Sequence, residues 1–276
     1  MTPRQRLGAH LGIARLHLRA RLAYRGDFLF RVLGLLLQVY LLALVWRAVY
    51  PDSGSAAAHG GQQVALATQL AYVTYASVQN WLLNPAGMDP TPIPQRVREG
   101  SVAIDLARPV AFPTQMLSAQ AGAVLAGAPF ALLALPFAVL AGGARAPASA
   151  GAALAYLLSM VPAVLNALLL AVVVSMVCFW TLEVVGVFII FRVVGQFLAG
   201  ALVPLWFMPS WLAELTRLLP FQTTTYTPVA LYLGQVEGAG PVLAALAVSC
   251  GWTVALWLLM RLVWSRALHR VVVQGG

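Results

Sequence analysis

The amino-acid composition excludes an ordinary water-soluble protein, because 61% of the 276 residues are hydrophobic, against about 45–50% in a soluble domain. The formal net charge of +9 comes from arginine, since the chain contains no lysine. A phosphate-binding loop of the G-x-x-x-x-G-K-[ST] type needs a lysine, so this chain cannot bind ATP through such a loop.

Long apolar runs predict an all-α, polytopic membrane protein with six transmembrane helices in a single domain over residues 1–276. Runs of about 20 residues recur along the chain, and they are continuous rather than alternating, which is typical of membrane helices. The segments between them are too short to bury a core of their own. The predicted spans are 28–50, 64–83, 110–140, 150–178, 184–203 and 242–263.

The positions of the arginines test the number of spans. Residues 3–24 carry apolar and basic side chains on separate stripes, which predicts an amphipathic helix lying in the inner membrane interface. With both termini in the cytoplasm, six spans leave Arg47, Arg145 and Arg217 outside. The excess of arginine on the other side agrees with the positive-inside rule. The arginines placed inside are Arg4, Arg6, Arg15, Arg19, Arg21, Arg25, Arg96, Arg98, Arg108, Arg261, Arg266 and Arg270.

The most polar stretch of the chain is RVREGSVAIDLARPV at 96–110, between the second and third predicted spans. This topology places it in the cytoplasm, where an ordinary positively charged loop would also lie. A short charged helix that ends at Pro109 would suit docking against a partner, because ion pairs define the register and the proline forces a turn. The charged candidates are Arg96, Arg98, Glu99, Asp105 and Arg108.

Two of the predicted spans carry polar residues at membrane depth. The span 64–83 contains several uncharged polar residues, so we expect it to pack against protein rather than lipid. Arg192 lies near the middle of the span 184–203, one turn from Gln196. An arginine at that depth costs at least about 2.5–3.5 kcal/mol, so it either anchors neighbouring helices or lines a translocation path. Glu183 is expected at the inner interface.

Residues for acid–base, nucleophilic or metal chemistry are scattered along the chain. The four histidines lack the spacing of a metal site, and the eight acidic residues do not gather at one interface. We therefore predict no catalytic residue, no metal and no cofactor in this chain. Nucleic-acid binding is also disfavoured, since no basic patch has a domain to sit on. A secondary carrier, a membrane enzyme and a regulatory subunit remain alternatives to an ATP-driven transport subunit.

Four segments of the chain carry a resemblance to a known family. They are LAYRGDFLFRVLG at 22–34, IPQRVREGSVAIDLARPV at 93–110, FWTLEVVGV at 179–187 and ALVPLWFMPSWLAELTRLLPFQTTTYTPVALYLG at 201–234. Together they resemble the permeases of ABC transporters of the type-2 exporter class (ABC-2 type), in the bacterial branch that has two related permease subunits and a separate ATPase.

The resemblance implies how such a permease would work. Residues 91–108 would form a cytoplasmic coupling helix in a groove of the ATPase, and residues 3–24 a connecting helix beside it. Two copies of the ATPase would bind ATP and Mg, and a second permease subunit would complete the pathway, with a heterodimer favoured over a homodimer. The complex would lie in the bacterial cytoplasmic (inner) membrane and export a hydrophobic or amphipathic substrate, such as a drug, a lipid or a peptide.

The same resemblance implies short re-entrant or interfacial helices in residues 204–240, on the extracellular side before the last span. Aromatic side chains in this segment would anchor it at the membrane interface and form an outer gate. These aromatic residues are Trp206, Phe207, Trp211, Phe221 and Tyr226.

Overall fold

The computed structural model describes residues 3–23, 25–50, 55–57, 63–84, 91–140, 143–181 and 185–274. Within these ranges the protein is α-helical apart from one short antiparallel hairpin. The elements are α1 (Pro3–Ala23), α2 (Arg25–Val49), β1 (Ser55–Ala57), β2 (Gln63–Ala65), α3 (Leu66–Leu83), α4 (Ile93–Arg98), α5 (Val102–Leu106), α6 (Phe112–Leu140), α7 (Ala150–Ser175), η1 (Met176–Phe179), α8 (Val185–Leu198), η2 (Leu205–Phe207), α9 (Ser210–Arg217), η3 (Phe221–Thr224), α10 (Tyr226–Tyr232) and α11 (Ala239–Gln274).

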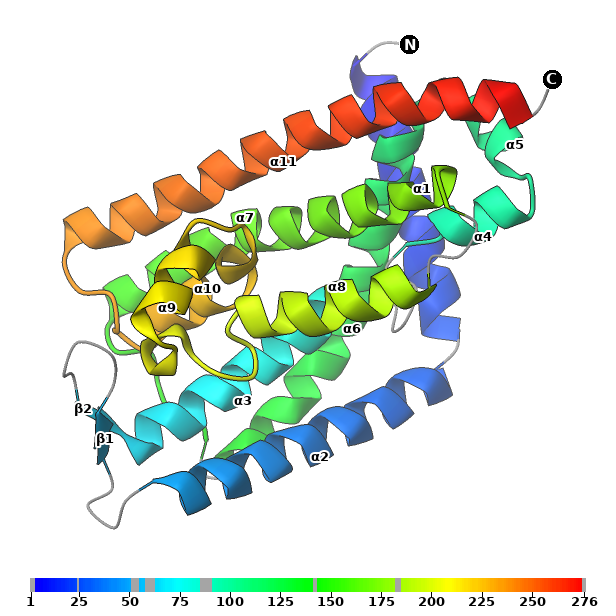
Figure 1. Cartoon of the computed structure of the whole chain (residues 1–276). Helices are drawn as coiled ribbons and strands as arrows, with labels where there is room; N and C mark the ends of the chain where they lie inside the picture. The colour runs from blue at the N-terminus through cyan, green and yellow to red at the C-terminus, as the bar shows by residue number, and fades with distance from the viewer. Residues whose placement is uncertain are drawn as a thin grey trace.

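The long helices form a bundle with two different ends (Figure 1). Helices α2, α3, α7, α8 and α11 run in roughly the same direction, and α6 crosses them obliquely. One end carries α4, α5 and both chain termini, and α1 lies across the bundle near it. The other end carries the hairpin and the short elements η2 to α10. The charged stretch and the aromatic segment of the sequence thus lie at opposite ends of the bundle.

Four helices in the described ranges are long and apolar enough to cross a membrane, so the protein is a multi-pass membrane protein. The candidate spans are Leu29–Val49, Phe112–Ala134, Ala150–Phe179 and Ala239–Arg270. Helix α8 is apolar but has 14 residues, fewer than the roughly 20 that a straight span requires. The count of six spans therefore stays a prediction, in which α3 and α8 would be the additional two.

Helix α3 lies inside the bundle, which explains its polar composition. The side chains of Gln69, Thr74, Ser77 and Gln79 are each no more than 3% exposed. The expectation that this segment packs against protein is therefore confirmed. Such polar side chains lower the hydropathy of the helix but can hydrogen-bond to neighbouring elements inside the membrane.

The charged stretch 91–108 forms two short helices, α4 and α5, rather than one. Gly100 stands between them with a φ of 69°, a left-handed conformation that glycine adopts at no steric cost. The chain turns there, and α4 and α5 form a compact projection at one end of the bundle (Figure 1). We call residues 91–109 the cytoplasmic tip, after the side of the membrane that the sequence predicts for them.

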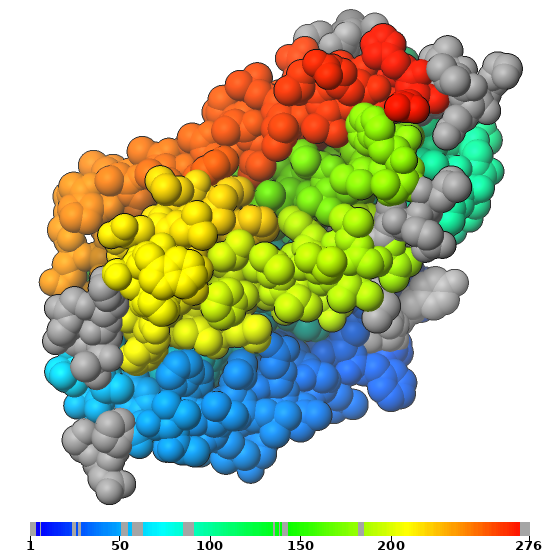
Figure 2. Space-filling view, in the orientation of Figure 1, coloured from blue at the N-terminus to red at the C-terminus, as the bar shows by residue number. Residues whose placement is uncertain are grey.

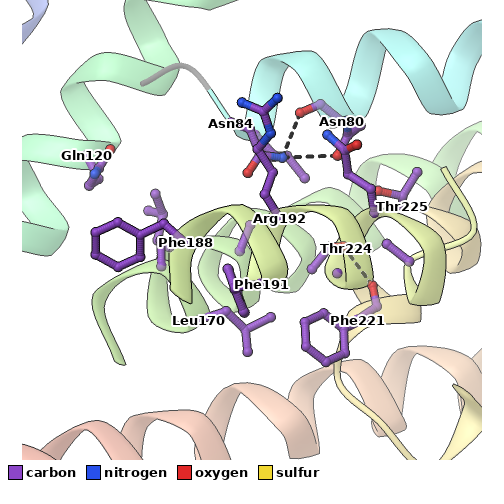
Figure 3. A pocket seen from close by; sticks show the side chains of 17 residues that line it. Asn80, Asn84, Gln120, Leu170, Phe188, Phe191, Arg192, Phe221, Thr224 and Thr225 are labelled. Carbon is purple, nitrogen blue, oxygen red and sulfur yellow. Dashed lines mark hydrogen bonds between the residues drawn. The ribbon is translucent and has the colours of Figure 1, made fainter. Parts of the chain in front are cut away.

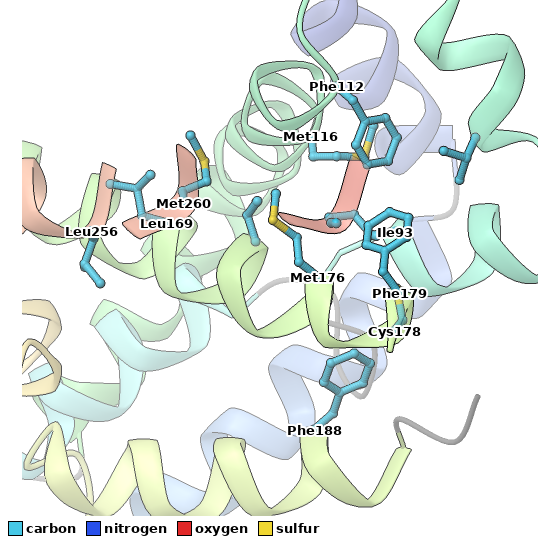
Figure 4. Packing of buried hydrophobic residues seen from close by; sticks show 13 residues of the cluster. Ile93, Phe112, Met116, Leu169, Met176, Cys178, Phe179, Phe188, Leu256 and Met260 are labelled. Carbon is cyan, nitrogen blue, oxygen red and sulfur yellow. The ribbon is translucent and has the colours of Figure 1, made fainter. Parts of the chain in front are cut away.

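An apolar cluster joins the cytoplasmic tip to the membrane helices (Figure 4). Ile93 of α4 and Val102 of α5 are 0% and 5% exposed, and they belong to the same buried cluster as Phe112 and Met176. The aromatic rings of this cluster are close together, since Phe112 stacks on Trp264 of α11 with ring centroids 5.1 Å apart. The tip is therefore packed against the ends of α6, α7 and α11.

Helix α1 packs on α6 at very short range. A Cβ atom at Gly122 of α6 would collide with the backbone carbonyl of Ala14, so only glycine allows this crossing. His10 also bonds to Ser118 of α6, with 2.8 Å between Nδ1 and Oγ. The buried face of α1 thus includes polar residues, while Leu7 is 61% exposed. The two stripes predicted from the sequence do not coincide with the buried and exposed faces.

Candidate functional site

Asp105 is the centre of the cytoplasmic tip. Asp105 is only 1% exposed to solvent, although it lies on a short helix at the end of the molecule. Arg96 of α4 and Arg108 beyond α5 both form ion pairs with its carboxylate, and the distance from Arg108 Nη1 to Asp105 Oδ1 is 3.1 Å. Two arginines therefore hold one buried carboxylate, and this triad fixes α4 against α5.

Gln115, in the first turn of α6, ties the triad to the membrane helix. Its side-chain Nε2 donates to the backbone carbonyls of Asp105 and Val110, at 2.9 and 2.8 Å. Arg108 Nη1 in turn donates to Gln115 Oε1 at 3.3 Å. These bonds stiffen the turn between α5 and α6. Sequence reasoning missed Gln115, although a glutamine at the polar start of an apolar run was a usable signal.

The outward face of the cytoplasmic tip combines charge with one large apolar residue. Arg98 and Glu99 are exposed, and Gln95 Nε2 donates to Glu99 Oε1 at 2.7 Å. Ile104 of α5 is 67% exposed, although an isoleucine gains free energy from burial. Five charged residues were predicted in this stretch. The structure assigns Arg96 and Asp105 to the interior of the tip and leaves Arg98, Glu99 and Arg108 at its surface.

His17 of α1 lies near the cytoplasmic tip. Partial burial lowers the pKa of His17 from its usual value, and the nearby positive charges of Arg96 and Arg21 lower it further. Arg96 of α4 therefore acts electrostatically on His17 of α1.

Arg192 and Gln196 line a cleft between α8 and the interior of the bundle (Figure 3). Asn80 and Asn84 of α3 lie on the opposite wall, and Figure 3 shows Arg192 extending from α8 toward Asn84. Asn84 Nδ2 donates to the backbone oxygen and to the Oδ1 of Asn80, at 2.9 and 3.0 Å. We call this feature the α8 cleft. The predicted candidate Glu183 lies outside the described residues.

Three of the predicted outer aromatic residues, Trp206, Phe207 and Tyr226, belong to one apolar cluster. The ring of Trp206 lies 4.6 Å from that of Tyr72 on α3 and 5.7 Å from that of Tyr226. The ring of Phe207 lies 6.5 Å from that of Trp206 and stacks on Trp46 of α2 at 5.3 Å. These contacts hold the outer segment, residues 199–234, against the ends of α2 and α3.

The other two predicted aromatic residues have different surroundings. Phe221 packs against α8, with its ring 5.9 Å from that of Phe191, and it also lines the α8 cleft. Trp211 is 66% exposed and stands on α9, apart from the cleft. The structure thus brings Trp206, Phe207 and Tyr226 together, packs Phe221 against α8, and leaves Trp211 exposed.

Polar residues of α3 hold the outer segment by neutral hydrogen bonds. The hydroxyl group of Tyr72 donates to the backbone oxygen of Gly200 at 2.8 Å. Gln79 Nε2 donates to the backbone oxygen of Thr224 at 2.6 Å, and Trp206 Nε1 donates to Gln69 Oε1 at 3.3 Å. These contacts give Gln69, Tyr72 and Gln79 of the helix a polar partner in the outer segment.

A family model described as "ABC-2 family transporter protein" matches residues 36–275. The chain belongs to this family. A search of curated proteins found no match. The ABC-2 permease is accordingly a membrane subunit of an ABC transporter, without a nucleotide-binding domain of its own, and its family implies association with an ABC ATPase.

No group of three or more His, Cys, Asp or Glu side chains that could hold a metal ion occurs in the described part of this permease. The three features of the described residues on which a proposal of function can rest are the cytoplasmic tip, the α8 cleft and the outer segment.

Proposed function

We propose that this chain is one of two permease subunits of an ATP-driven exporter for a hydrophobic or amphipathic substrate. Two copies of a separate ATPase bind ATP and Mg²⁺ and drive the cycle. The chain crosses the bacterial cytoplasmic membrane six times, with α3 and α8 as the second and fifth spans, and both termini lie in the cytoplasm. The cytoplasmic tip is the coupling element that contacts the ATPase.

The architecture of the cytoplasmic tip is the observation that carries this proposal. Its two helices are held by the buried carboxylate of Asp105, which is paired with Arg96 and Arg108. A rigid projection transmits a displacement, whereas a loose loop absorbs it. The outward face offers exposed Ile104 as an apolar contact, with charged residues around it that would define the docking register.

The buried side of the tip supports transmission of movement into the membrane. Ile93 and Val102 share an apolar cluster with Phe112 of α6, Met176 of η1 and Met260 of α11 (Figure 4). Closely packed interiors transmit strain rather than dissipate it. A displacement of the tip by the closing ATPases would therefore move the inner ends of these helices together, which is the kind of rigid-body change used in alternating access.

The exposed face of α8 supports a second permease subunit. Figure 2 shows α8 at the surface, between α2 and α11, and its outward residues include Ile190, which is 65% exposed, and Val193, which is 56% exposed. Such an exposed apolar face would suit contact with a second membrane subunit. The family branch favours a related but different permease, giving a heterodimer.

The outer segment would serve as the gate at the other end of the pathway. Its aromatic residues Trp206 and Tyr226 rest on Tyr72 of α3, and Phe221 rests on α8. Movement of α3 relative to α8 would therefore change the position of these rings together. The α8 cleft, between these two helices, lies on the path from the cytoplasmic tip to the gate.

Copurification of the ATPase tests the proposed function. The chain is expressed with its neighbouring transporter subunits, extracted in mild detergent and recovered by a tag. We expect a lysine-containing Walker-type ATPase to be recovered with it. Ile104→Asp and Arg98→Glu change exposed side chains of the tip and should abolish that recovery. Arg217→Glu, a matched charge reversal on α9 of the outer segment, should leave recovery unchanged.

Three results of this experiment would overturn the proposal. Recovery of the chain without any ATPase, combined with transport that survives ATP depletion, would indicate a secondary carrier. Recovery of an ATPase that is insensitive to the changes at Ile104 and Arg98 would remove the coupling role of the tip. ATPase association without any ATP-dependent movement of substrate would indicate a regulatory subunit.

A further inference from the structure

Helix α1 has one face packed on protein and one face open. It lies across the long helices, near the end of the bundle that carries α4 and α5 (Figure 1). Ala14 on its packed face meets Gly122 of α6. A helix that crosses membrane-spanning helices near one end runs along the membrane surface, so its open face meets the interface between lipid and water.

The open face of α1 carries leucines and arginines. Leu7, Leu11 and Leu16 are 61%, 48% and 66% exposed, and Arg15 and Arg19 are exposed as well. On a helix with about 3.6 residues per turn, the two arginines follow one another along the middle of this face. The leucines then lie on both sides of them. We call this surface the α1 face; it comprises residues 4, 7, 8, 11, 12, 15, 16 and 19.

The described residues of the chain leave the α1 face uncovered and its charge unbalanced. A Cβ atom at Gly8 or Gly12 on this face would meet no atom within 4 Å. Helix α1 contains no aspartate or glutamate, and neither Arg15 nor Arg19 forms an ion pair within the described ranges. Whatever covers this face should therefore supply negative charge as well as apolar contact.

The headgroup region of an anionic lipid leaflet meets both requirements. Water alone would leave the leucines without the free energy of burial, and hydrocarbon alone would remove the hydration of the arginines. In the headgroup region, phosphate oxygens accept hydrogen bonds from guanidinium groups, while acyl chains lie within reach of apolar side chains. Basic residues beside an anionic leaflet are also attracted by its surface potential. A protein partner would need acidic residues in register with the arginines, whereas lipid is present along the whole helix.

We propose that the α1 face binds anionic phospholipids of the leaflet at the end of the bundle that carries the cytoplasmic tip. A lipid phosphate lies between Arg15 and Arg19 and accepts hydrogen bonds from both guanidinium groups. Acyl chains lie against Leu11 and Leu16, beside the arginines. This interaction goes beyond the proposed function, since it needs neither ATP nor a transported substrate.

Native mass spectrometry of the purified full chain tests the proposal. The chain is delipidated in detergent and titrated separately with phosphatidylglycerol and with phosphatidylcholine of identical acyl chains. We expect the first phosphatidylglycerol to bind about tenfold more tightly than the first phosphatidylcholine, the order of effect that two basic residues have on an anionic lipid. Glycerol phosphate, a soluble head without chains, should not displace phosphatidylglycerol at equal concentration.

Paired substitutions locate the effect on α1. Arg15→Gln combined with Arg19→Gln should abolish the preference for phosphatidylglycerol and leave the affinity for phosphatidylcholine unchanged. Lysine at both positions should retain most of the preference, because the charge remains. Arg266→Gln combined with Arg270→Gln removes two exposed arginines from α11 at the same end of the bundle. This matched control should retain the preference. Gel filtration and thermal unfolding verify that each variant is folded.

Hydrogen–deuterium exchange of the full chain in nanodiscs gives a second readout. The amides of residues 3–23 should exchange more slowly in nanodiscs of phosphatidylglycerol than in nanodiscs of phosphatidylcholine. The paired glutamine variant of α1 should lose this difference, because the lipid no longer holds the helix.

Equal affinity for the two lipids would overturn the proposal, as would a preference that persists without Arg15 and Arg19 or disappears equally in the α11 control. Displacement by glycerol phosphate would show that the site binds a soluble anion instead of a lipid. Slower exchange of α1 that requires added ATPase, whatever the lipid, would assign the face to a protein partner. The lipid titrations need no ATPase, and the copurification variants lie outside α1, so failures of the two proposals are distinguishable.

Discussion

The two ends of this permease are held together by different forces. At the cytoplasmic tip, the carboxylate of Asp105 lies between Arg96 and Arg108. At the outer end, Tyr72 and Gln79 hold the chain by neutral hydrogen bonds to backbone oxygens, supported by aromatic contacts. The tip therefore depends on a network of ion pairs, whereas the bonds of Tyr72 and Gln79 at the outer end join uncharged groups.

The difference follows from the surroundings of each end. Arg96 and Arg108 have side chains that are 23% and 50% exposed, so water solvates part of their charge and the desolvation cost stays small. The bonds of α3 to the outer segment are buried inside the bundle, where an ionised group would be far more expensive than an amide or a hydroxyl. The comparison shows that ion pairs hold the tip where water reaches the arginines, whereas Tyr72 and Gln79 hold the buried part of the outer end without charge.

Removal of the buried charge is the strongest test of this comparison. Asp105→Asn leaves the two arginines without their common counter-charge. It should cost about 2–3 kcal/mol of stability, slightly less than a fully buried pair because the arginines reach water. The measurement is thermal unfolding in detergent together with limited proteolysis of residues 91–109, and ATPase recovery should fall in parallel.

A matched change at the outer end serves as the control for that prediction. Glu214→Gln on α9 neutralises an exposed acid and should change stability by less than about 0.5 kcal/mol. An equal loss of stability in the two variants would show that charge supports both ends and would remove the contrast between them.

Close backbone packing supports both ends, and substitutions of glycine test it there. A Cβ atom at Gly122 would collide with the carbonyl of Ala14, and one at Gly143 would collide with Thr74 Oγ1. Each change to alanine should cost about 1–3 kcal/mol through overpacking. Gly251→Ala on α11 meets no atom within 4 Å and should be neutral or slightly stabilising. Thermal unfolding of the three variants distinguishes a loss of stability caused by overpacking from an effect that any glycine-to-alanine change would have.

The sequence predicted the parts of this fold that depend on composition. Apolar runs marked the long helices to within a few residues, and the polar residues of α3 predicted burial against protein, as observed for Gln69 and Thr74. The last helix is the main exception, because α11 extends to Gln274 rather than ending near 263. Its arginines lie on an exposed surface, where they do not oppose helix formation.

Features that depend on tertiary packing could not be predicted from the sequence. The face of α1 that contacts α6 is set by the crossing at Gly122, which lies more than 100 positions away. Ile104 is an apolar residue in an amphipathic stretch, and the sequence alone did not show that its side chain is exposed. The separation of Trp211 from Trp206 likewise depends on how α9 folds away from α3. Patterns within one segment carry no information on such long-range contacts.

A single hydrogen bond tests the neutral end of the comparison. Tyr72→Phe removes the bond from the buried hydroxyl group to the backbone oxygen of Gly200. It should lower stability by about 1 kcal/mol and loosen the outer segment without changing ATPase recovery. Tyr40→Phe, on an exposed face of α2, is the matched control and should have no effect on thermal unfolding. A loss of ATPase recovery in Tyr72→Phe would mean that the two ends are not independent.

The smallest expected effect concerns the positive charge around His17 at the cytoplasmic end. Burial and the charges of Arg96 and Arg21 lower the pKa of His17 in the folded protein, whereas the unfolded chain keeps a value of about 6.5. Below that pH the unfolded state binds more protons than the folded state, so stability falls as the pH decreases. Above it both states are neutral at His17, and the contribution to the pH dependence disappears.

A pH series of thermal unfolding between about pH 5 and 8, which brackets the usual histidine pKa, measures this effect. The wild-type chain should lose thermal stability below about pH 6.5, and His17→Gln should flatten that part of the curve. His269→Gln, at an exposed position of α11, should retain the wild-type slope. A flat profile for the wild-type chain, or an equal slope in His17→Gln, would contradict the lowered pKa of His17. Burial is the larger cause of that lowered pKa, and the charges of Arg96 and Arg21 add to it. Through Arg96, part of the effect links α1 to one of the charges that hold the tip.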